Sequence, residues 1–264
     1  MATIKVVVNG ALGKVGQVLV NAMSSGTEVQ LVGAADVKAT RDSLPLPDES
    51  GEIPLSKDLE AILDSCKPDV VVDFTIAGAV MSSAKSVAKH GVNMVIGTTG
   101  LSADDRSELA KLAEENKVGI VMAPNFSLGA VLLMYLSKLT SKYMDYAEII
   151  ELHHDQKVDA PSGTALLTAR EMAAARDKPF SRPATGDFKS RGEEVEGINV
   201  HAVRLPGLMA HQEVIFGGPG QTLSIRHDTI NRECYIPGVM IAIKEVVKRQ
   251  GLTYGLDALL DLQG

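Results

Sequence analysis

The sequence has no tryptophan and only two cysteines, and it lacks the long apolar and basic runs that mark several classes of protein. No stretch reaches the roughly 18 to 20 apolar residues that a membrane helix needs, and MATIKVVVNG becomes polar too early for a signal peptide. Cys66 and Cys234 have no C-x-x-C spacing, which excludes a zinc knuckle and a disulfide framework. We therefore expect a soluble cytoplasmic protein with reduced thiols, no membrane partner and no metal ion.

The charge of the chain is moderate and acidic. The formal net charge is -7, and Lys and Arg are not gathered into one tract. Because a nucleic-acid surface needs such a tract or face, we expect no nucleic acid partner. With 264 residues, 45% of them hydrophobic, the chain can bury one large core or two modest ones.

Short apolar runs alternate with helical patterns over the first half of the chain. Such βα units, with strands apolar on both faces, predict an α/β fold with a parallel, doubly wound sheet, whose ligands bind beyond the carboxyl ends of the strands. The apolar runs are 4–9, 29–35, 70–74, 93–96 and 119–122, and the helical patterns include 15–23, 58–65, 80–90 and 103–115.

A glycine turn, Gly10-x-x-Gly13-x-x-Gly16, follows the first strand. The pattern alone is weak, but here it separates a strand from a helix, and Asp36 ends the next strand where a carboxylate can bind a ribose. The alternatives are a tight turn without ligand and an ordinary strand-end cap. Together the features favour a dinucleotide. We expect NADH, with NADPH as an alternative because Lys38 and Arg41 lie close to Asp36.

A second glycine cluster, Gly97-Thr98-Thr99-Gly100, follows a later strand. Its hydroxyls and flexible backbone suit the nicotinamide side of the cofactor, although a plain turn with a capped helix is an equal alternative.

After residue 125 the organisation changes. The pattern predicts a long helix at 128–144, a strand at 147–152, a helix at 162–175 and a mobile loop at 176–197. Strand-like stretches between 198 and 229 predict an antiparallel or mixed sheet, and 237–249 is a helix that returns to the first domain.

The segment ELHHDQKVDAPSGTA, residues 151–165, carries the chemistry. His153 and Lys157 are candidate acid/base groups, while Ser162 and Thr164 offer hydroxyls at the start of a helix that favours anions. The alternatives are a structural role for His154, a solvated surface lysine and simple helix capping. A small anionic substrate is expected.

This chain resembles the 4-hydroxy-tetrahydrodipicolinate reductases, also called dihydrodipicolinate reductases. The resemblance rests on NGALGKVG, DFT at 73–75, GTTG at 97–100, APNFSLG at 123–129 and above all on the 151–165 segment. It implies a Rossmann-like dinucleotide-binding domain from 1–126 and 235–264, and a central α+β domain at 127–234 that binds substrate and builds a homotetramer through a mixed sheet. The implied reaction is NAD(P)H-dependent reduction of 4-hydroxy-tetrahydrodipicolinate, through its dehydrated imine, on the diaminopimelate route to lysine.

The resemblance also assigns residues. It implies that His153 and Lys157 are catalytic, that His154 binds substrate, and that Gly163 and Thr164 hold a substrate carboxylate. The implied cofactor contacts are Gly10, Ala11, Leu12, Gly13, Lys14, Val15, Asp36, Gly97, Thr98, Thr99, Ala123, Pro124, Asn125 and Phe126. From the residues themselves we add Lys38 to the cofactor contacts and Ser162 to the substrate contacts.

The chain departs from the family pattern at two places. Val37 stands where many members have arginine, and Asp155 and Gln156 stand at positions that are often basic. With Val37 in place, recognition of a 2′-phosphate is left to Lys38 or Arg41 or is lost. With Asp155 and Gln156 in place, we expect the substrate pocket to be less positive than is usual in the family.

The substrate implied by the resemblance is a small dicarboxylate, so we expect the site to neutralise two anions and donate a proton to carbon. We favour Lys157 as the donor and His153 as its acid/base partner, although the sequence does not order them. Three arginines could reach the second carboxylate or stabilise subunit contacts, and the sequence does not decide between these roles: Arg204, Arg226 and Arg232.

Two rival functions remain open. One is another Rossmann dehydrogenase, acting on an aspartate-derived semialdehyde or on an amino acid. Semialdehyde enzymes that form an acyl intermediate need a nucleophilic cysteine, but Cys66 and Cys234 have no histidine close in sequence and no catalytic-looking turn. The other is a nucleotide-sensing regulator, which would keep the glycine turn and lose the His-His-x-x-Lys set.

Overall fold

The computed structural model describes residues 3–182, 189–260 and 262. The chain divides into two compact units, one made by Met1–Phe126 with Tyr235–Gly264 and the other by Ser127–Cys234. In the described part of the chain, no helix is long and apolar enough to cross a bilayer.

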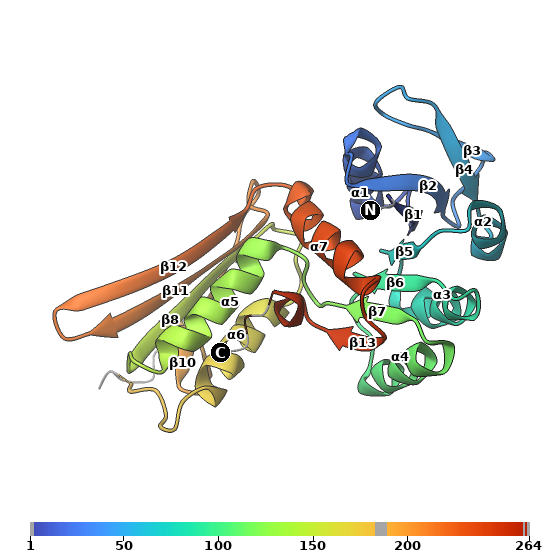
Figure 1. The fold of residues 1–264 in the computed structure, drawn as a ribbon. Helices are drawn as coiled ribbons and strands as arrows, with labels where there is room; N and C mark the ends of the chain where they lie inside the picture. Colours follow the sequence, from blue (N-terminus) through green and yellow to red (C-terminus); the bar gives the residue numbers. More distant parts are fainter. Residues whose placement is uncertain (1–2, 183–188, 261, 263–264) are drawn as a thin grey trace. The chain divides into compact units, whose positions relative to one another are not determined.

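The first unit is built on an eight-stranded sheet (Figure 1). Its order is β13-β7-β6-β5-β1-β2-β4-β3, and neighbouring strands are parallel except β3 and β4. This arrangement confirms the predicted parallel sheet. The strands are β1 (Ile4–Asn9), β2 (Val29–Ala35), β3 (Ser43–Pro45), β4 (Glu52–Ser56), β5 (Val70–Asp73), β6 (Asn93–Ile96), β7 (Gly119–Met122) and β13 (Gly251–Tyr254).

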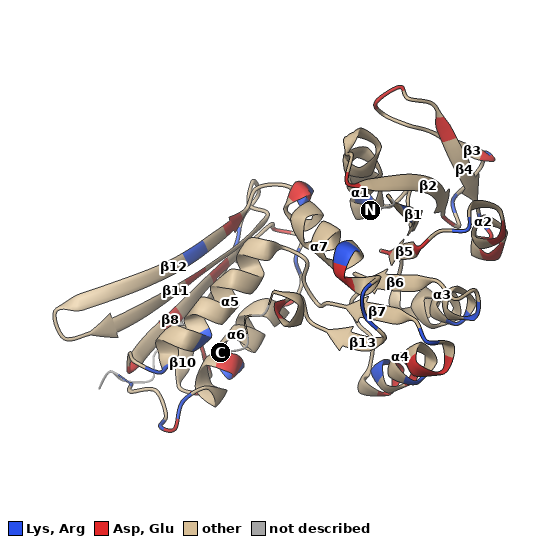
Figure 2. Cartoon of the chain, viewed as in Figure 1, with Lys and Arg blue, Asp and Glu red and all other residues tan. Residues whose placement is uncertain are grey.

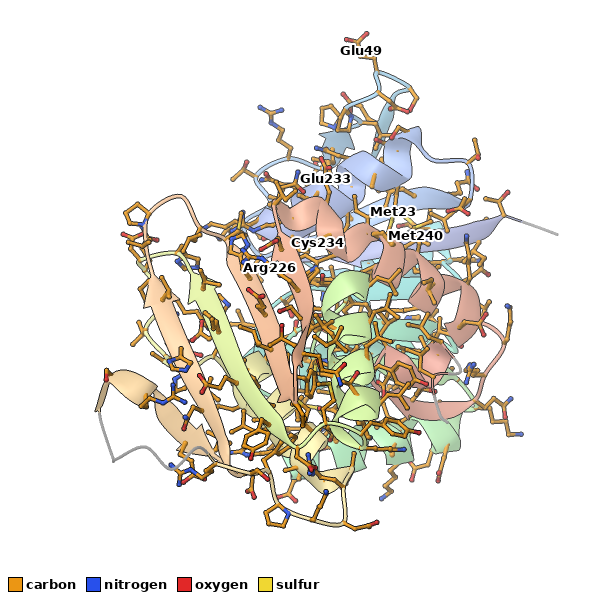
Figure 3. All side chains as sticks on the ribbon, turned by 90° about the vertical axis from the view of Figure 1, so that its left-hand side faces the viewer. Met23, Glu49, Arg226, Glu233, Cys234 and Met240 are labelled. Carbon is orange, nitrogen blue, oxygen red and sulfur yellow. The ribbon has the colours of Figure 1, made fainter. Side chains whose placement is uncertain are left out.

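Helices cover both faces of this sheet. On one face α2, α3 and α4 close a core around Val7, Val71 and Met94. On the other, α7 packs on β5, β6 and β7 and contacts α1; Figure 3 labels Met240 on α7 and Met23 on α1. Burial on both faces explains why the central strands read as continuous valine-rich runs. The helices are α1 (Lys14–Ser25), α2 (Leu59–Cys66), α3 (Ala77–Lys89), α4 (Ala103–Asn116) and α7 (Ile236–Val246), followed by the short η3 (Asp257–Leu259).

The second unit is a five-stranded mixed sheet with two helices on one face. The strand order is β12-β11-β8-β10-β9; β8 is parallel to β10 and antiparallel to β11. Helices α5 and α6 pack on the same core around Ile149, Val214 and Phe216. The elements are α5 (Leu128–Ser141), β8 (Tyr146–His153), α6 (Gly163–Ala174), η1 (Lys189–Arg191), β9 (Glu193–Val195), β10 (Ile198–Arg204), β11 (Ala210–Gly218), β12 (Gln221–Thr229) and η2 (Arg232–Tyr235).

Some sequence predictions about individual elements are wrong. The segment 176–197 is not one loop, because its described part contains η1 and β9; residues 183–188 lie outside the described part. Strand β9 forms a hairpin with β10 across Glu196 and Gly197, whose φ values of 53° and 83° are typical of a type I′ turn. The sequence also misses β3, β4 and β13, which are short, and α5 ends at Ser141 rather than at 144.

The turn from β1 into α1 depends on close backbone contact. Gly10 has a φ of 83°, and a Cβ on Gly16 would overlap the carbonyl oxygen of Gly10. We predict that Gly16→Ala lowers the free energy of unfolding by about 3 kcal/mol, because neither backbone segment can move away without opening the turn. Denaturant titration followed by circular dichroism measures this loss.

Gly78→Ala is the matched control, because nothing lies within 4 Å of a Cβ at this position in helix α3. It should raise the free energy of unfolding by up to about 1 kcal/mol. Equal losses in both variants would contradict the contact explanation.

Candidate active site

The carboxyl ends of the parallel strands in the first unit carry most of the predicted cofactor residues. Gly10, Asp36, Gly97 and Ala123 each follow directly after a strand. The Gly10 N–H donates to Ala35 O at 2.8 Å, and the Gly13 N–H donates to Gly10 O at 3.0 Å. These bonds place the start of α1 at the edge where a phosphate group can meet its first free N–H groups.

The carboxylate of Asp36 is buried and holds the glycine turn against the end of β2. Its Oδ2 accepts from the Leu12 N–H and its Oδ1 from the Lys38 N–H, each at 2.9 Å. Each carboxylate oxygen has a second lone pair, so Asp36 can shape the turn and still accept a bond from a ribose hydroxyl.

Asp73 is a second buried carboxylate at this edge, and the sequence analysis did not assign it to the site. It accepts from the Asn9 side chain at 2.7 Å, from the Thr75 hydroxyl at 2.7 Å and from the Thr98 hydroxyl at 3.1 Å. Asp73 therefore ties together the ends of β1, β5 and β6. An acidic residue that ends an apolar strand was the available signal.

Phe74 explains the glycine at position 97. A Cβ on Gly97 would overlap the Phe74 ring, and this ring also lies 5.8 Å from that of Phe126. Of the neighbouring predicted contacts, Thr98 is buried, while Thr99 and Pro124 are exposed. The structure thus brings the 97–99 loop and Phe126 together around one aromatic ring.

In the second unit, the site is organised by Glu151, which the sequence analysis missed. Glu151 follows Ala147 and Ile149 on the helix-covered face of β8, and its side chain is fully buried. Its Oε2 lies 2.6 Å from His153 Nδ1, and Arg204 donates to both carboxylate oxygens at 2.8 Å. The Ser162 N–H donates to Oε1 at 3.0 Å. One carboxylate thus joins the histidine to the start of α6.

The register of the sheet makes this cluster possible. Strand β10 runs parallel to β8 with Arg204 beside His153, which places the guanidinium next to the buried carboxylate. The role of Arg204, left open by the sequence, is therefore to pair with Glu151. The sequence signal for Glu151 was a charged residue at a position where the alternation along the strand places buried side chains.

The charge of Glu151 determines which nitrogen of His153 can exchange protons. Burial alone would raise the pKa of Glu151, but the hydrogen bonds from His153 and Arg204 outweigh it and lower the pKa from 4.5 to about 2. An ionised carboxylate only accepts hydrogen bonds, so His153 Nδ1 donates to Glu151, and Nε2 is the ring nitrogen that this bond does not use. The bonds from Glu151 raise the pKa of Arg204.

Lys157 forms an ion pair two residues further along the chain. Its Nζ lies 2.7 and 2.9 Å from the carboxylate oxygens of Asp159. The bond from Lys157 is the main reason why the pKa of Asp159 is lowered, and the Gly163 N–H contributes to it. His154 lies on the same loop and is exposed.

Helix α6 starts at Gly163 and is capped by Ser162. The buried Ser162 hydroxyl accepts from the Ala165 N–H at 3.2 Å, so this hydroxyl already has a structural use. Gly163 is exposed, and nothing lies within 4 Å of a Cβ built on it. The Thr164 carbonyl accepts from Thr168. The first turn of α6 thus offers backbone N–H groups to an anion.

Arg226 belongs to a different cluster. It pairs with Asp228 on its own strand and with Glu213 on β11. Figure 2 shows the two signs of charge on β12, and Figure 3 labels Arg226 on that strand. In this structure Arg226 is therefore a partner of two acidic residues within the sheet.

Two family models match this chain. One, described as "Dihydrodipicolinate reductase, N-terminus", matches residues 4–126, and the other, "Dihydrodipicolinate reductase, C-terminus", matches residues 129–260. The chain belongs to the dihydrodipicolinate reductase family. As a member it is an oxidoreductase that reduces 4-hydroxy-tetrahydrodipicolinate with NAD(P)H in the diaminopimelate route to lysine. This confirms the predicted family and reaction, and removes the semialdehyde and regulator alternatives.

Individual relatives agree with this assignment over their full length. A 4-hydroxy-tetrahydrodipicolinate reductase of Dehalococcoides mccartyi is 52% identical, covering 99% of this chain and 100% of the relative. That of Moorella thermoacetica is 47% identical, with 99% of each chain covered. A dipicolinate-bound dihydrodipicolinate reductase from a Paenisporosarcina species has a TM-score of 0.86 at 39% identity, covering 97% of this chain and 99% of that chain.

The buried ion pair of this reductase allows a stability prediction. Glu151→Gln should lower the free energy of unfolding at neutral pH by about 3 kcal/mol, because it leaves the Arg204 charge without its partner. Since the folded-state pKa is lowered, the stabilisation is present above pH 4.5 and is lost as the pH falls toward about 2. Urea titrations of both proteins across this pH range should therefore converge in acid.

Glu148→Gln is the control on the same strand. Glu148 pairs with Arg191 and with His201 but is 33% exposed, so its loss should cost less than about 1 kcal/mol. Equal losses of unfolding free energy in the two variants would contradict the prediction that burial makes the Glu151 pair contribute more to stability than the Glu148 pairs.

Proposed function

We propose that His153 and Lys157 perform the proton transfers of this reduction, and that the start of α6 holds a carboxylate of the substrate. The observation that carries the proposal is the buried carboxylate of Glu151. It bonds His153 on one side and the backbone of Ser162 on the other, at 2.6 and 3.0 Å. The Glu151 carboxylate thereby holds both an acid/base group and a helix start that can bind an anion.

A ring dicarboxylate fits this arrangement. The similar Paenisporosarcina protein was solved with dipicolinate bound, and we transfer a small dicarboxylate ligand to this chain. Lys157 and the N–H groups of Gly163 and Thr164 would neutralise its two negative charges, together with His153 whenever this side chain is protonated. The exposed His154 lies on the same loop as Lys157 and is assigned a substrate contact.

The first unit fits a dinucleotide. The glycine turn from Gly10 to Val15 would place the pyrophosphate at the start of α1, and Asp36 would bind the adenosine ribose. Residues 97–99 and 123–126 would line the nicotinamide side. When bound, NAD(P)H supplies the hydride, so the remaining task of the chain is to bind, orient and protonate the substrate.

The chemistry of the substrate requires a positioned acid. Reduction of a conjugated imine moves electrons toward nitrogen and then requires a proton on carbon. We assign Lys157 Nζ as the donor and His153 Nε2 as the acid/base partner that stabilises charge beside it. Glu151 keeps His153 in the orientation and tautomer that leave Nε2 free for this exchange.

The activity is tested by following the near-ultraviolet absorbance of reduced nicotinamide with freshly generated 4-hydroxy-tetrahydrodipicolinate. Oxidation of NADH or NADPH that requires this substrate gives the reference turnover against which the proposed residue roles are judged. A folded protein that oxidises neither cofactor would refute it.

Removal of either proton-transfer group should depress turnover selectively. We predict that Lys157→Ala and His153→Ala each lower kcat by about 100-fold or more, while the Kd for NADH stays within about twofold, because neither group is among the proposed cofactor contacts. Steady-state kinetics and fluorescence titration measure the two quantities. A large loss of NADH affinity would contradict separate cofactor and substrate groups.

The choice between the two cofactors depends on the end of β2. We propose NADH as the cofactor, with NADPH accepted through Lys38 or Arg41, both exposed beyond Asp36. Lys38→Ala should then lower kcat/KM for NADPH by about fivefold and leave that for NADH unchanged, since only NADPH carries the 2′-phosphate. NADH is the internal control, and an equal change with both cofactors would rule out this role of Lys38. The homotetramer and the cytoplasmic location stay predictions.

A further inference from the structure

Asp159 occupies donors that the proposed function assigns to the substrate. Both of its carboxylate oxygens lie within 2.9 Å of Lys157 Nζ. A substrate carboxylate that binds Lys157 therefore meets a carboxylate of the protein already bound there.

We propose that Asp159 is an internal competitor of the substrate, a carboxylate that must release Lys157 before a ring dicarboxylate can bind it. This inference rests on the proposed function, because it uses the same anion-binding groups. It adds a residue that sets the affinity for dicarboxylates without taking part in proton transfer.

The backbone and the side chain of Asp159 are held very differently. Arg204 Nη2 donates to the Asp159 carbonyl oxygen at 2.6 Å, so the main chain is tied to the buried Glu151 pair. The Asp159 side chain, in contrast, is 58% exposed. A rotation of this side chain can therefore release Lys157 while the loop and helix α6 stay in place.

The strength of the contact suits displacement. An ion pair with one well-exposed partner contributes little, because water solvates the Asp159 carboxylate once the charges separate. A second charged ligand that gains Lys157 and helix N–H groups together can therefore replace Asp159. The product of the reaction is also a ring dicarboxylate, so the return of Asp159 to Lys157 would favour product release by the same competition.

The test is the affinity for pyridine-2,6-dicarboxylate, measured by calorimetry on the NADH-saturated enzyme. Asp159→Asn keeps the shape of the side chain and removes its charge, so Kd should fall about two- to fivefold. Asp159→Glu keeps the charge and should bind within about twofold of the wild type. An unchanged or higher Kd in Asp159→Asn, with folding verified by melting temperature, overturns the proposal. If Asp159→Asn is unstable, Asp159→Ser is judged by the same criterion.

Asp155→Asn is the matched control, since Asp155 is an exposed carboxylate on the same loop. It removes the same charge without touching the Lys157 pair. An equal gain in affinity at positions 155 and 159 would mean that net charge alone acts, and would also overturn the proposal.

The proposed function and the competitor role of Asp159 can be refuted independently. If Lys157→Ala abolishes turnover while Asp159→Asn leaves affinity unchanged, only the competitor role is wrong. If Lys157→Ala keeps full turnover, the proposed function is wrong, whatever happens at Asp159.

Discussion

The second unit depends on one carboxylate removed from water. Glu151 can remain ionised in the core because three donors surround it: His153, the Arg204 guanidinium and the backbone of Ser162. Each donor belongs to a different part of the unit, namely β8, β10 and the start of α6. A shift of any one of these elements would remove at least one of these donors from a buried charge, which is a costly defect in a protein. The geometry of the site is therefore enforced by the stability of the unit.

The first unit is also held together by a buried carboxylate that accepts several hydrogen bonds. Asp73 is also fully buried, but it lies at the end of a strand and accepts bonds from a strand end and from loops rather than from an arginine. Because its partners are the Asn9 amide and the Thr75 and Thr98 hydroxyls, it joins three strand ends without adding positive charge. Such an edge can present backbone N–H groups to a phosphate while its loops stay fixed.

Much of this structure follows from the sequence. The bounds of β2, β6 and β7 agree with the apolar runs 29–35, 93–96 and 119–122, because strands buried on both faces leave an uninterrupted signal. The family and its reaction follow from the 151–165 segment. The role of Glu151 could not be predicted, since it depends on the pairing of β8 with a strand 53 residues further on, which places Arg204 beside it. Edge strands such as β13 and β9 could not be predicted either, because a strand that pairs with a neighbour on one side only need not be a continuous apolar run.

The first unit is built from two segments that lie far apart in the sequence, and this affects the order in which the units can fold during synthesis. As the chain leaves the ribosome, residues 127–234 form a continuous unit that is complete before α7 and β13 have been made. The eight-stranded sheet must wait, with one apolar face and the β7 edge open, until the last 30 residues emerge. The central unit can therefore mature first, and the nascent amino-terminal strands are the part of this chain that most needs protection from aggregation.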